Sequence, residues 1–462
     1  MKTVLVIASD FPPLVGTNTQ RVQSFIRHLP SFGWTSRVIT QAIADLPQID
    51  SRELRGVPSG ICVTRVPNPD PFAVRARLLG NGPPDMAADL SGCAEGRGQA
   101  CRTGGEKEDA NQSLPTRWVR EVGSSVVKAV LRTFFYIPDP LRLWAERVGT
   151  VGVEGELEGL QAVLSSSPAY SCHLAGLALK RRLGVPWVAD FRDLWVGRPY
   201  RVAPKYMNAL RDRRLEAKVV AECDRIVLAS PAWANTFMGR YGDDIQSKLT
   251  VITNGYDAEV LDDARLRVCP RSPDRTSPRF LLTGSMHEGE SPVPFIRALG
   301  AIRAGDPKLV AGVKVEFVGS SGQVQSTIQR EIDANGLTAH FNIISATSNT
   351  ECIAKQLDAD CLLLFLSAAH AETVCGKGFE YMATGRPILA CVPTNGVQAE
   401  ILRQAGTAII VDHGDVEAIT CALRGFLSNG GNQCEPAWTY IKTFERQVLT
   451  KKLAAILDEV IV

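Results

Sequence analysis

The chain has 462 residues, more than one ordinary hydrophobic core contains, so two domains of roughly 150–250 residues are expected. Hydrophobic residues make up 45% and charged residues 22%, which is typical of a soluble globular protein. The net charge of only +2 gives no electrostatic reason to expect a nucleic-acid partner.

Short apolar runs alternate with amphipathic stretches from one end of the chain to the other. In the first half, strands are predicted at residues 4–9, 36–40, 62–66, 161–166, 187–190, 225–229 and 249–252. In the second half, strands are predicted at 280–283, 314–318, 341–344, 361–365, 387–391 and 407–411. Because strands that alternate with helices form mostly parallel sheets covered on both faces, the expected fold class is α/β, with Rossmann-like doubly wound sheets.

A boundary between two domains is predicted within residues 264–279, which are rich in Pro, Ser and Arg and precede a new strand. The expected domains are therefore 1–263 and 279–435, and a last helix within 436–462 crosses back to the first domain. Residues 80–115 contain many Gly, Pro and charged residues and few large apolar ones, so a flexible surface insertion is expected. The alternative for this insertion is a lid over a binding site.

The twelve cysteines are scattered singly, without a C-x-x-C pair, so neither a zinc site nor a disulfide framework is expected. The first apolar run is short, and Asp10-Phe11-Pro12-Pro13 follows where a signal-peptide cleavage site would stand. No segment approaches the eighteen or so apolar residues of a spanning helix. We therefore expect a cytoplasmic protein, with peripheral contact at the inner membrane face left open.

Three polar segments follow strands of the first half. The loop around Gly16 lies between a strand and a helix, where ligands of doubly wound folds bind, although a plain turn is the alternative. It lacks the G-x-G-x-x-G pattern, so no nicotinamide cofactor is expected. Ser165–Ser167 are expected to cap a helix, and His173 inside that helix is expected to be structural. Asp190, Arg192 and Asp193 follow the apolar strand VPWVA and are interpreted as lining a cleft, with a structural Arg–Asp pair as the alternative.

The most informative segment is Glu372–Pro387, ETVCGKGFEYMATGRP, which follows the strand 361–365. A short helix is predicted from about Lys377 to Thr384, ended by Gly385 in the left-handed conformation. Gly376 and Gly378 are expected to leave the helix N-terminus open to an anion, and Lys377 adds a positive charge there. Glu380 is suited to accept hydrogen bonds from two neighbouring hydroxyls, such as those of a ribose. Together these features predict a nucleoside-diphosphate site.

With these residues in place, the chain resembles glycosyltransferase family four, a group of retaining transferases with the GT-B fold. Glu372 and Glu380 have the spacing of the family's paired glutamates, and KGFEYMATGRPIL resembles the version in bacterial polysaccharide and natural-product transferases. Ser-Pro at 167–168, ADFRDLW at 189–195, ITNGYD at 252–257 and TGSMHEG at 283–289 extend the likeness along the chain. The chain departs from the family's pattern at Thr373, at Cys375 and at residues 285–287, where relatives carry an arginine and a lysine.

The resemblance implies transfer of a sugar from a nucleoside-diphosphate sugar, with UDP favoured, to a polysaccharide, lipid-linked or small-molecule acceptor. Retention of anomeric configuration is expected, without a cofactor or bound metal. The predicted catalytic residues are Glu372, Asp190, Arg192 and Asp193. The predicted donor-binding residues are Gly16, Gly284, Ser285, Lys377, Gly378, Phe379 and Glu380. Two alternatives stay open: a GT-B sugar-nucleotide epimerase, and a non-catalytic partner subunit, which the substitutions at 285–287, 373 and 375 would suit.

Overall fold

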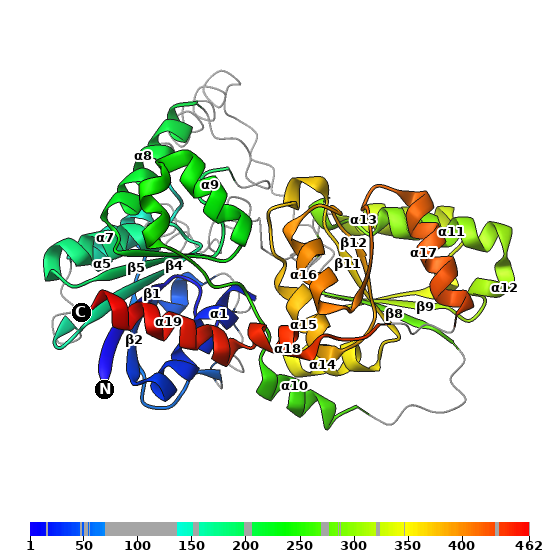
Figure 1. The fold of residues 1–462 in the computed structure, drawn as a ribbon, viewed down its shortest axis with the longest axis horizontal. Coiled ribbons are helices and arrows are strands. Elements are labelled where there is room, and N and C mark those ends of the chain that lie inside the picture. Colours follow the sequence, from blue (N-terminus) through cyan, green and yellow to red (C-terminus); the bar gives the residue numbers. More distant parts are fainter. Residues whose placement is uncertain are drawn as a thin grey trace, which may run out of the picture.

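The computed structural model describes residues 1–14, 17–46, 49, 54, 56–69, 136–150, 157–197, 206–268, 277–284, 286, 288–319, 324–345, 347–429 and 434–461. The predicted insertion at 80–115 lies outside these residues. The described chain forms two parallel sheets, each covered by helices on both faces, in two halves of the molecule (Figure 1). The predicted α/β class with two Rossmann-like domains is thereby confirmed.

The first sheet has seven strands in the order β3-β2-β1-β4-β5-β6-β7. The strands are β1 Lys2–Ala8, β2 Trp34–Gln41, β3 Cys62–Val66, β4 Ala162–Ser167, β5 Trp187–Phe191, β6 Arg225–Leu228 and β7 Leu249–Val251. The helices that accompany them are α1 Thr17–His28, α5 Arg142–Thr150, α7 Ser171–Leu183, α8 Tyr206–Glu222 and α9 Pro231–Tyr241. Short 3-10 turns lie at η1 Leu29–Phe32, η2 Ile43–Asp45 and η4 Asp243–Lys248.

The second sheet has six strands in the order β10-β9-β8-β11-β12-β13. The strands are β8 Arg279–Thr283, β9 Lys314–Val318, β10 Phe341–Ile344, β11 Cys361–Phe365, β12 Ile388–Cys391 and β13 Ala408–Val411. The helices are α10 Ala258–Arg265, α11 Val293–Gly305, α12 Pro307–Val310, α13 Gln325–Ala334, α14 Asn349–Asp358, α15 Gly376–Thr384, α16 Val397–Ala405 and α17 Val416–Ser428. Short turns lie at η5 Glu288–Glu290, η7 Thr338–His340 and η8 Ala368–His370.

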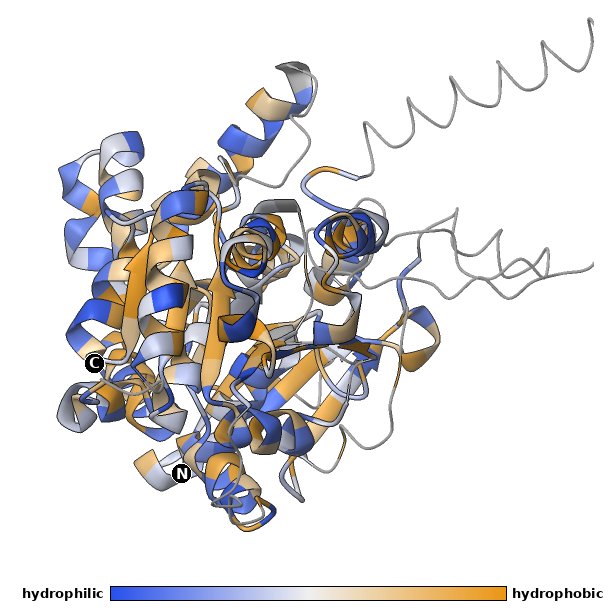
Figure 2. Ribbon diagram, turned by 90° about the vertical axis from the view of Figure 1, so that its right-hand side faces the viewer, coloured by the Kyte–Doolittle hydropathy of each residue, from blue (hydrophilic) through white to orange (hydrophobic). Residues whose placement is uncertain are grey.

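The strands are continuous apolar runs because both faces of each sheet are covered. Along β1, Leu5 and Ile7 pack into the core on one face, while Val4 and Val6 pack into the core on the other. All four side chains are fully buried. Figure 2 shows the same arrangement across the molecule, with hydrophobic strands between helices whose outer faces are hydrophilic.

The C-terminal segment crosses from the second domain to the first, as α18 Trp438–Ile441, η9 Lys442–Phe444 and α19 Arg446–Val460. The single helix expected there is broken at Glu445, whose backbone is extended (ψ 135°) and pairs with Tyr256. Leu453 and Leu457 of α19 then complete the core of the first sheet. Figure 1 shows α19 lying beside α1.

The domain boundary lies earlier in the chain than predicted. Helix α10 packs on α14, and its Leu261 and Ala264 belong to the core of the second domain (Figure 1). The chain therefore leaves the first domain after β7, near Gly255. A side chain at Gly255 would overlap the carbonyl of Phe444, so this glycine permits the close approach of the returning segment.

Among the described helices, none combines the length and the apolar character that crossing a membrane requires.

Candidate functional site at the carboxyl ends of the second sheet

The candidate site begins where β8 and β11 meet. Strand β8 connects outward to β9, whereas β11 begins the other half of the sheet, so the loops after β8 and β11 diverge and ligands of such sheets bind between them. Gly284 ends β8 with a φ of 94°, and Gly319 ends β9 with a φ of 137°. A side chain on Gly319 would overlap the backbone of Gly284. The two glycines thus let the backbone at the ends of β8 and β9 pack closely together at this site.

Helix α15 brings the paired-glutamate segment to this point, between β11 and β12. It begins at Gly376 and ends at Thr384, and Gly385 caps it in the left-handed conformation with a φ of 70°, as predicted. A Cβ at Gly376 would meet no atom within 4 Å. Gly378 has a different role from the one expected, because a Cβ there would lie 2.5 Å from the side-chain nitrogen of Gln398. Gln398 also accepts a hydrogen bond from the backbone N–H of Cys375 (2.8 Å). Gly378 therefore permits helix packing rather than ligand access.

Lys377 lies at the N-terminal turn of α15 and forms an ion pair with Glu290, with 2.7 Å between Nζ and Oε2. The side chains are only 14% and 18% exposed, so the pair is largely removed from water. Burial lowers the pKa of Lys377, but the Glu290 carboxylate outweighs it and the net pKa is raised. A Cβ placed on Gly284 would lie 4.0 Å from the lysine ammonium, so the end of this side chain is near the end of β8. Lys377 is therefore a fixed cation at the carboxyl end of β8.

Glu380 lies about one helical turn further along α15, and its carboxyl interacts electrostatically with Arg446 at the start of α19. Burial raises the pKa of the Glu380 carboxyl, and Arg446, a hydrogen bond with Gln356 and Lys377 oppose this rise. Arg446 also donates to the backbone and side-chain oxygens of Gln20 on α1, at 2.6 and 2.8 Å. The carboxylate predicted to bind a ribose is thus electrostatically coupled to Arg446, which forms hydrogen bonds with the first domain.

Beneath the site, buried polar side chains hold α15 against β8. The hydroxyl of Tyr381 accepts from the backbone N–H of Thr283 (2.9 Å) and lies 3.1 Å from its side-chain oxygen. Gln356 on α14 donates to that same Thr283 oxygen at 3.1 Å. These hydrogen bonds fix the position of α15 relative to the end of β8.

Glu372 lies in the loop after η8 and is exposed. Its carboxylate accepts a hydrogen bond from Thr236 of α9 (3.0 Å), and its backbone carbonyl accepts one from Ser230 (2.5 Å). Both donors belong to the first domain. The structure therefore places Glu372 at the contact between the domains.

Asp190 occupies a different environment from the cleft-lining one predicted. It is fully buried, and Arg21 donates to both of its carboxylate oxygens, at 3.0 and 2.7 Å. Ser166 adds a third hydrogen bond at 2.7 Å. The alternative of a structural Arg–Asp pair describes this geometry, with Arg21 as the partner. Arg192 and Asp193 form an adjacent ion pair (2.8 Å) whose side chains are 10% and 15% exposed.

The remaining predicted site residues separate into two groups. The Phe379 side chain is fully buried and packs on Phe444 at 4.8 Å between ring centroids, so it belongs to the core and not to a ligand contact. Gly16 and Ser285 lie outside the described residues. Within the described part of the chain, no group of three or more metal-ligating side chains comes together.

Sequence reasoning missed Glu290, Arg446 and Thr236. One signal was present, because Arg446 opens a helix, where the helix dipole disfavours a cation unless anions lie nearby. Glu290 stands in the same loop as Gly284, but nothing local indicates that its carboxylate turns toward a lysine 87 residues away. Thr236 has no distinguishing sequence signal.

Two parallel-sheet domains whose carboxyl ends meet across a contact, with a crossing C-terminal helix, define the GT-B class of α/β proteins. The family model "Glycosyltransferase Family 4" matches residues 101–260, and "Glycosyl transferases group 1" matches residues 277–429. The chain belongs to the family-four, group 1 glycosyltransferases. The resemblance inferred from the sequence is confirmed.

Solved structures agree on the fold over the full length. Sucrose-phosphate synthase from Thermosynechococcus elongatus is 13% identical, with a TM-score of 0.62 and 99% of each chain covered. The Anabaena protein HepE is 12% identical, with a TM-score of 0.61, covering 99% of this chain and 100% of its own. A glycosyltransferase from Rickettsia africae is 13% identical, with a TM-score of 0.57, covering 99% and 98%. No curated protein sequence matches the chain.

Proposed function

We propose that this glycosyltransferase takes its sugar from a nucleoside-diphosphate sugar, with UDP favoured, and transfers it with retention of anomeric configuration and without a metal ion. The observation that carries the proposal is the position of Lys377, a largely buried cation in the first turn of α15 and near Gly284 at the carboxyl end of β8. A diphosphate binds favourably to a cation and a helix N-terminus held in one place. The HepE structure, which shares this fold, was determined in complex with UDP-glucose.

In this proposal, Lys377 and the first turn of α15 bind the diphosphate, and Glu380 accepts hydrogen bonds from the ribose. As the sugar–phosphate bond breaks, negative charge builds on the diphosphate, and a preorganised cation stabilises it without solvent rearrangement. Glu372 faces the sugar as positive charge develops on it. Arg192 and Asp193 line the acceptor side, whereas Asp190 pairs with Arg21 in the interior of the first domain.

The acceptor in this proposal is a polysaccharide, a lipid-linked glycan or a small molecule. The reaction takes place in the cytoplasm, with peripheral contact at the inner membrane face where the acceptor is lipid-linked. Sustained transfer in excess chelator is the expected behaviour, and activity that disappears until manganese or magnesium is added would contradict metal independence.

Calorimetric titration of nucleoside diphosphates into Lys377→Ala and Glu380→Gln variants tests the site. Loss of one charge-assisted phosphate contact should weaken binding to Lys377→Ala by about 1.5–3 kcal/mol, or roughly tenfold to a hundredfold. Part of that loss should appear in kcat, because the contact strengthens as the bond breaks. The Glu380→Gln effect should fall mainly on donor KM.

The control variant is Lys308→Ala, which removes an exposed lysine of the same domain, on α12. It should bind nucleotide as the unaltered protein does. Unaltered affinity in both site variants would refute the donor site. An absence of any nucleoside-diphosphate binding by the unaltered protein would favour a non-catalytic partner subunit, and release of an isomerised sugar nucleotide would favour an epimerase.

A further inference from the structure

The Glu290 carboxylate occupies the position next to Lys377 where the proposed function requires a phosphate. The two side chains are 2.7 Å apart and more than four-fifths buried. The same carboxylate also acts electrostatically on Cys375, the residue that caps the N-terminus of α15. The chain therefore supplies its own anion to the cation that would bind a diphosphate.

The backbone that carries Glu290 is held from two sides. The α-carbon of Gly289 packs so closely on His370 that a side chain there would overlap the imidazole, and the Gly289 carbonyl accepts from the backbone N–H of Ser367 at 2.8 Å. On the other side, the ring nitrogen Nε2 of His413 donates to the carbonyl of Ser291 at 3.0 Å. An incoming ligand would therefore displace the Glu290 side chain, while the backbone of Gly289 and Ser291 stays in place.

A neutral ion pair attracts a diphosphate much less than an unpaired lysine does, because the attraction of the cation and the repulsion of the carboxylate nearly cancel at short range. The Glu290 carboxylate and a diphosphate are not equivalent as partners of Lys377. A diphosphate has more charge and more acceptor oxygens than one carboxylate, so it can replace Glu290 as the partner of Lys377.

We propose that Glu290 is an internal competitor for the diphosphate site: it pairs with Lys377 in the free protein, is displaced when the donor binds, and thereby lowers the affinity for nucleoside diphosphates. This inference rests on the proposed function of the same site. It assigns Glu290 a specificity role, since only ligands with enough negative charge can displace the carboxylate, whereas an uncharged nucleoside does not compete with it.

The test compares Glu290→Gln with the unaltered protein in calorimetric titrations with UDP, GDP and ADP and with the matching nucleosides. The amide retains the shape of the side chain but removes its charge. The variant should bind its preferred nucleoside diphosphate about tenfold more tightly, a change of ~1.4 kcal/mol, and bind the nucleoside unchanged. A Glu290→Gln, Lys377→Ala double variant should lose most of that gain, because the released lysine is its source.

The matched control is Glu331→Gln, which neutralises a carboxylate of the same domain that is about as exposed as Glu290 but pairs with Arg297 outside the candidate site, and it should leave every affinity unaltered. Unchanged nucleoside affinity in Glu290→Gln also verifies that the variant is folded. Equal or weaker diphosphate binding by Glu290→Gln, alongside clear binding by the unaltered protein, would overturn the competitor role and leave the proposed function standing. If neither protein bound any nucleoside diphosphate, the proposed function itself would be refuted, and the competitor role with it.

Discussion

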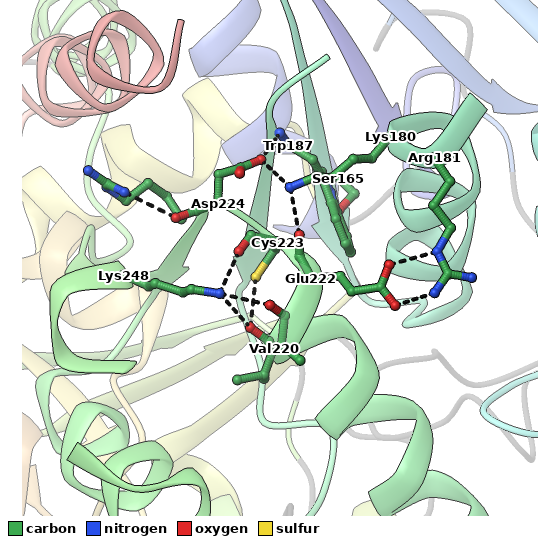
Figure 3. A network of polar contacts seen from close by, with 11 residues as sticks. Ser165, Lys180, Arg181, Trp187, Val220, Glu222, Cys223, Asp224 and Lys248 are labelled. Atoms are coloured by element: carbon green, nitrogen blue, oxygen red, sulfur yellow. Dashed lines mark hydrogen bonds and ion pairs between the residues drawn. The ribbon is translucent and has the colours of Figure 1, made fainter. Parts of the chain in front are cut away.

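The two ends of the strands in the first sheet use the same kinds of charged side chain in different ways. At the amino ends (Figure 3), Lys180 and the backbone N–H of Trp187 both donate to Asp224, and Lys248 donates to three backbone carbonyls at the end of α8. These groups are partly exposed. At the carboxyl ends, Asp190 and Arg21 are 1% and 5% exposed and bind each other through two hydrogen bonds.

The comparison shows that position and burial, rather than the kind of residue, decide what an ion pair does. At the amino ends, charged side chains satisfy backbone groups at strand and helix termini, where water is an alternative partner. At the carboxyl ends, the pair has little access to water, so each charge depends on the other. Lys377 and Glu290 at the carboxyl ends of the second sheet resemble the second case, and there a ligand can replace one partner.

The largest effect is expected where a buried charge loses its partner. Asp190→Ala leaves the Arg21 guanidinium without a carboxylate and should lower the free energy of unfolding by about 3–5 kcal/mol. Denaturant unfolding measures this loss. The double variant Asp190→Ala, Arg21→Met should recover part of it, because no charge then remains unpaired. A loss comparable to that of a surface substitution would show that the pair is not the buried anchor described above.

The second effect concerns His173, buried next to Phe191 with its Nδ1 2.8 Å from the Ser165 hydroxyl. Burial lowers the pKa of His173 to about 3, with Asp190 opposing. Because the folded-state pKa lies below the ordinary value of 6.5, the neutral ring favours folding above about pH 6.5. That contribution is lost as the pH falls toward 3, by up to ~1.4 kcal/mol per pH unit.

Replacing His173 by Asn, which cannot titrate, removes this dependence. The difference in unfolding free energy between the two proteins should therefore shrink as the pH is lowered from 7 to 5. Parallel stability profiles over that range would mean that the ring is not held neutral.

A smaller effect is expected at the amino ends. Lys248→Met retains the aliphatic part of the side chain but removes the ammonium that donates at 3.3, 2.9 and 3.0 Å to the carbonyls of Val220, Ala221 and Cys223. Since water can replace the half-buried ammonium, a loss of about 1 kcal/mol is expected by thermal or chemical unfolding. A loss as large as that of Asp190→Ala would erase the contrast between the two ends.

The smallest effect belongs to the exposed pair of Arg181 and Glu222 (Figure 3). The Arg181 hydrogen bond lowers the pKa of the Glu222 carboxyl, but both groups are well solvated. Glu222→Gln should change the melting temperature less than Lys248→Met does, and the change should vanish in high salt because surface ion pairs are screened. A decrease in melting temperature that does not depend on salt would show that this pair behaves like the buried ion pairs.

Many local features were predictable. Strands 62–66, 314–318, 341–344 and 361–365 have the predicted bounds, because apolar runs between helical stretches are recognisable over a few residues. The end of α15 at Gly385 follows from the same kind of local signal. The family also followed from local motifs, and the comparisons confirm it. The roles of Gly378 and Phe379 could not be predicted from local motifs, because Gly378 packs against Gln398 and Phe379 packs against Phe444, which lies far along the chain.

By itself, the sequence determined the alternation of strands and helices, the α/β class, and the placing of Glu372, Lys377 and Glu380 on one short segment after a strand. Tertiary structure alone decided which charges meet. Arg21 and Asp190 are 169 residues apart, Lys377 and Glu290 are 87 apart, and Arg446 reaches Gln20 across 426 residues. The physical reason is one of range: backbone preference and hydrophobic periodicity act over a few neighbouring residues, whereas an ion pair forms between whichever side chains the packed sheets bring within about 4 Å.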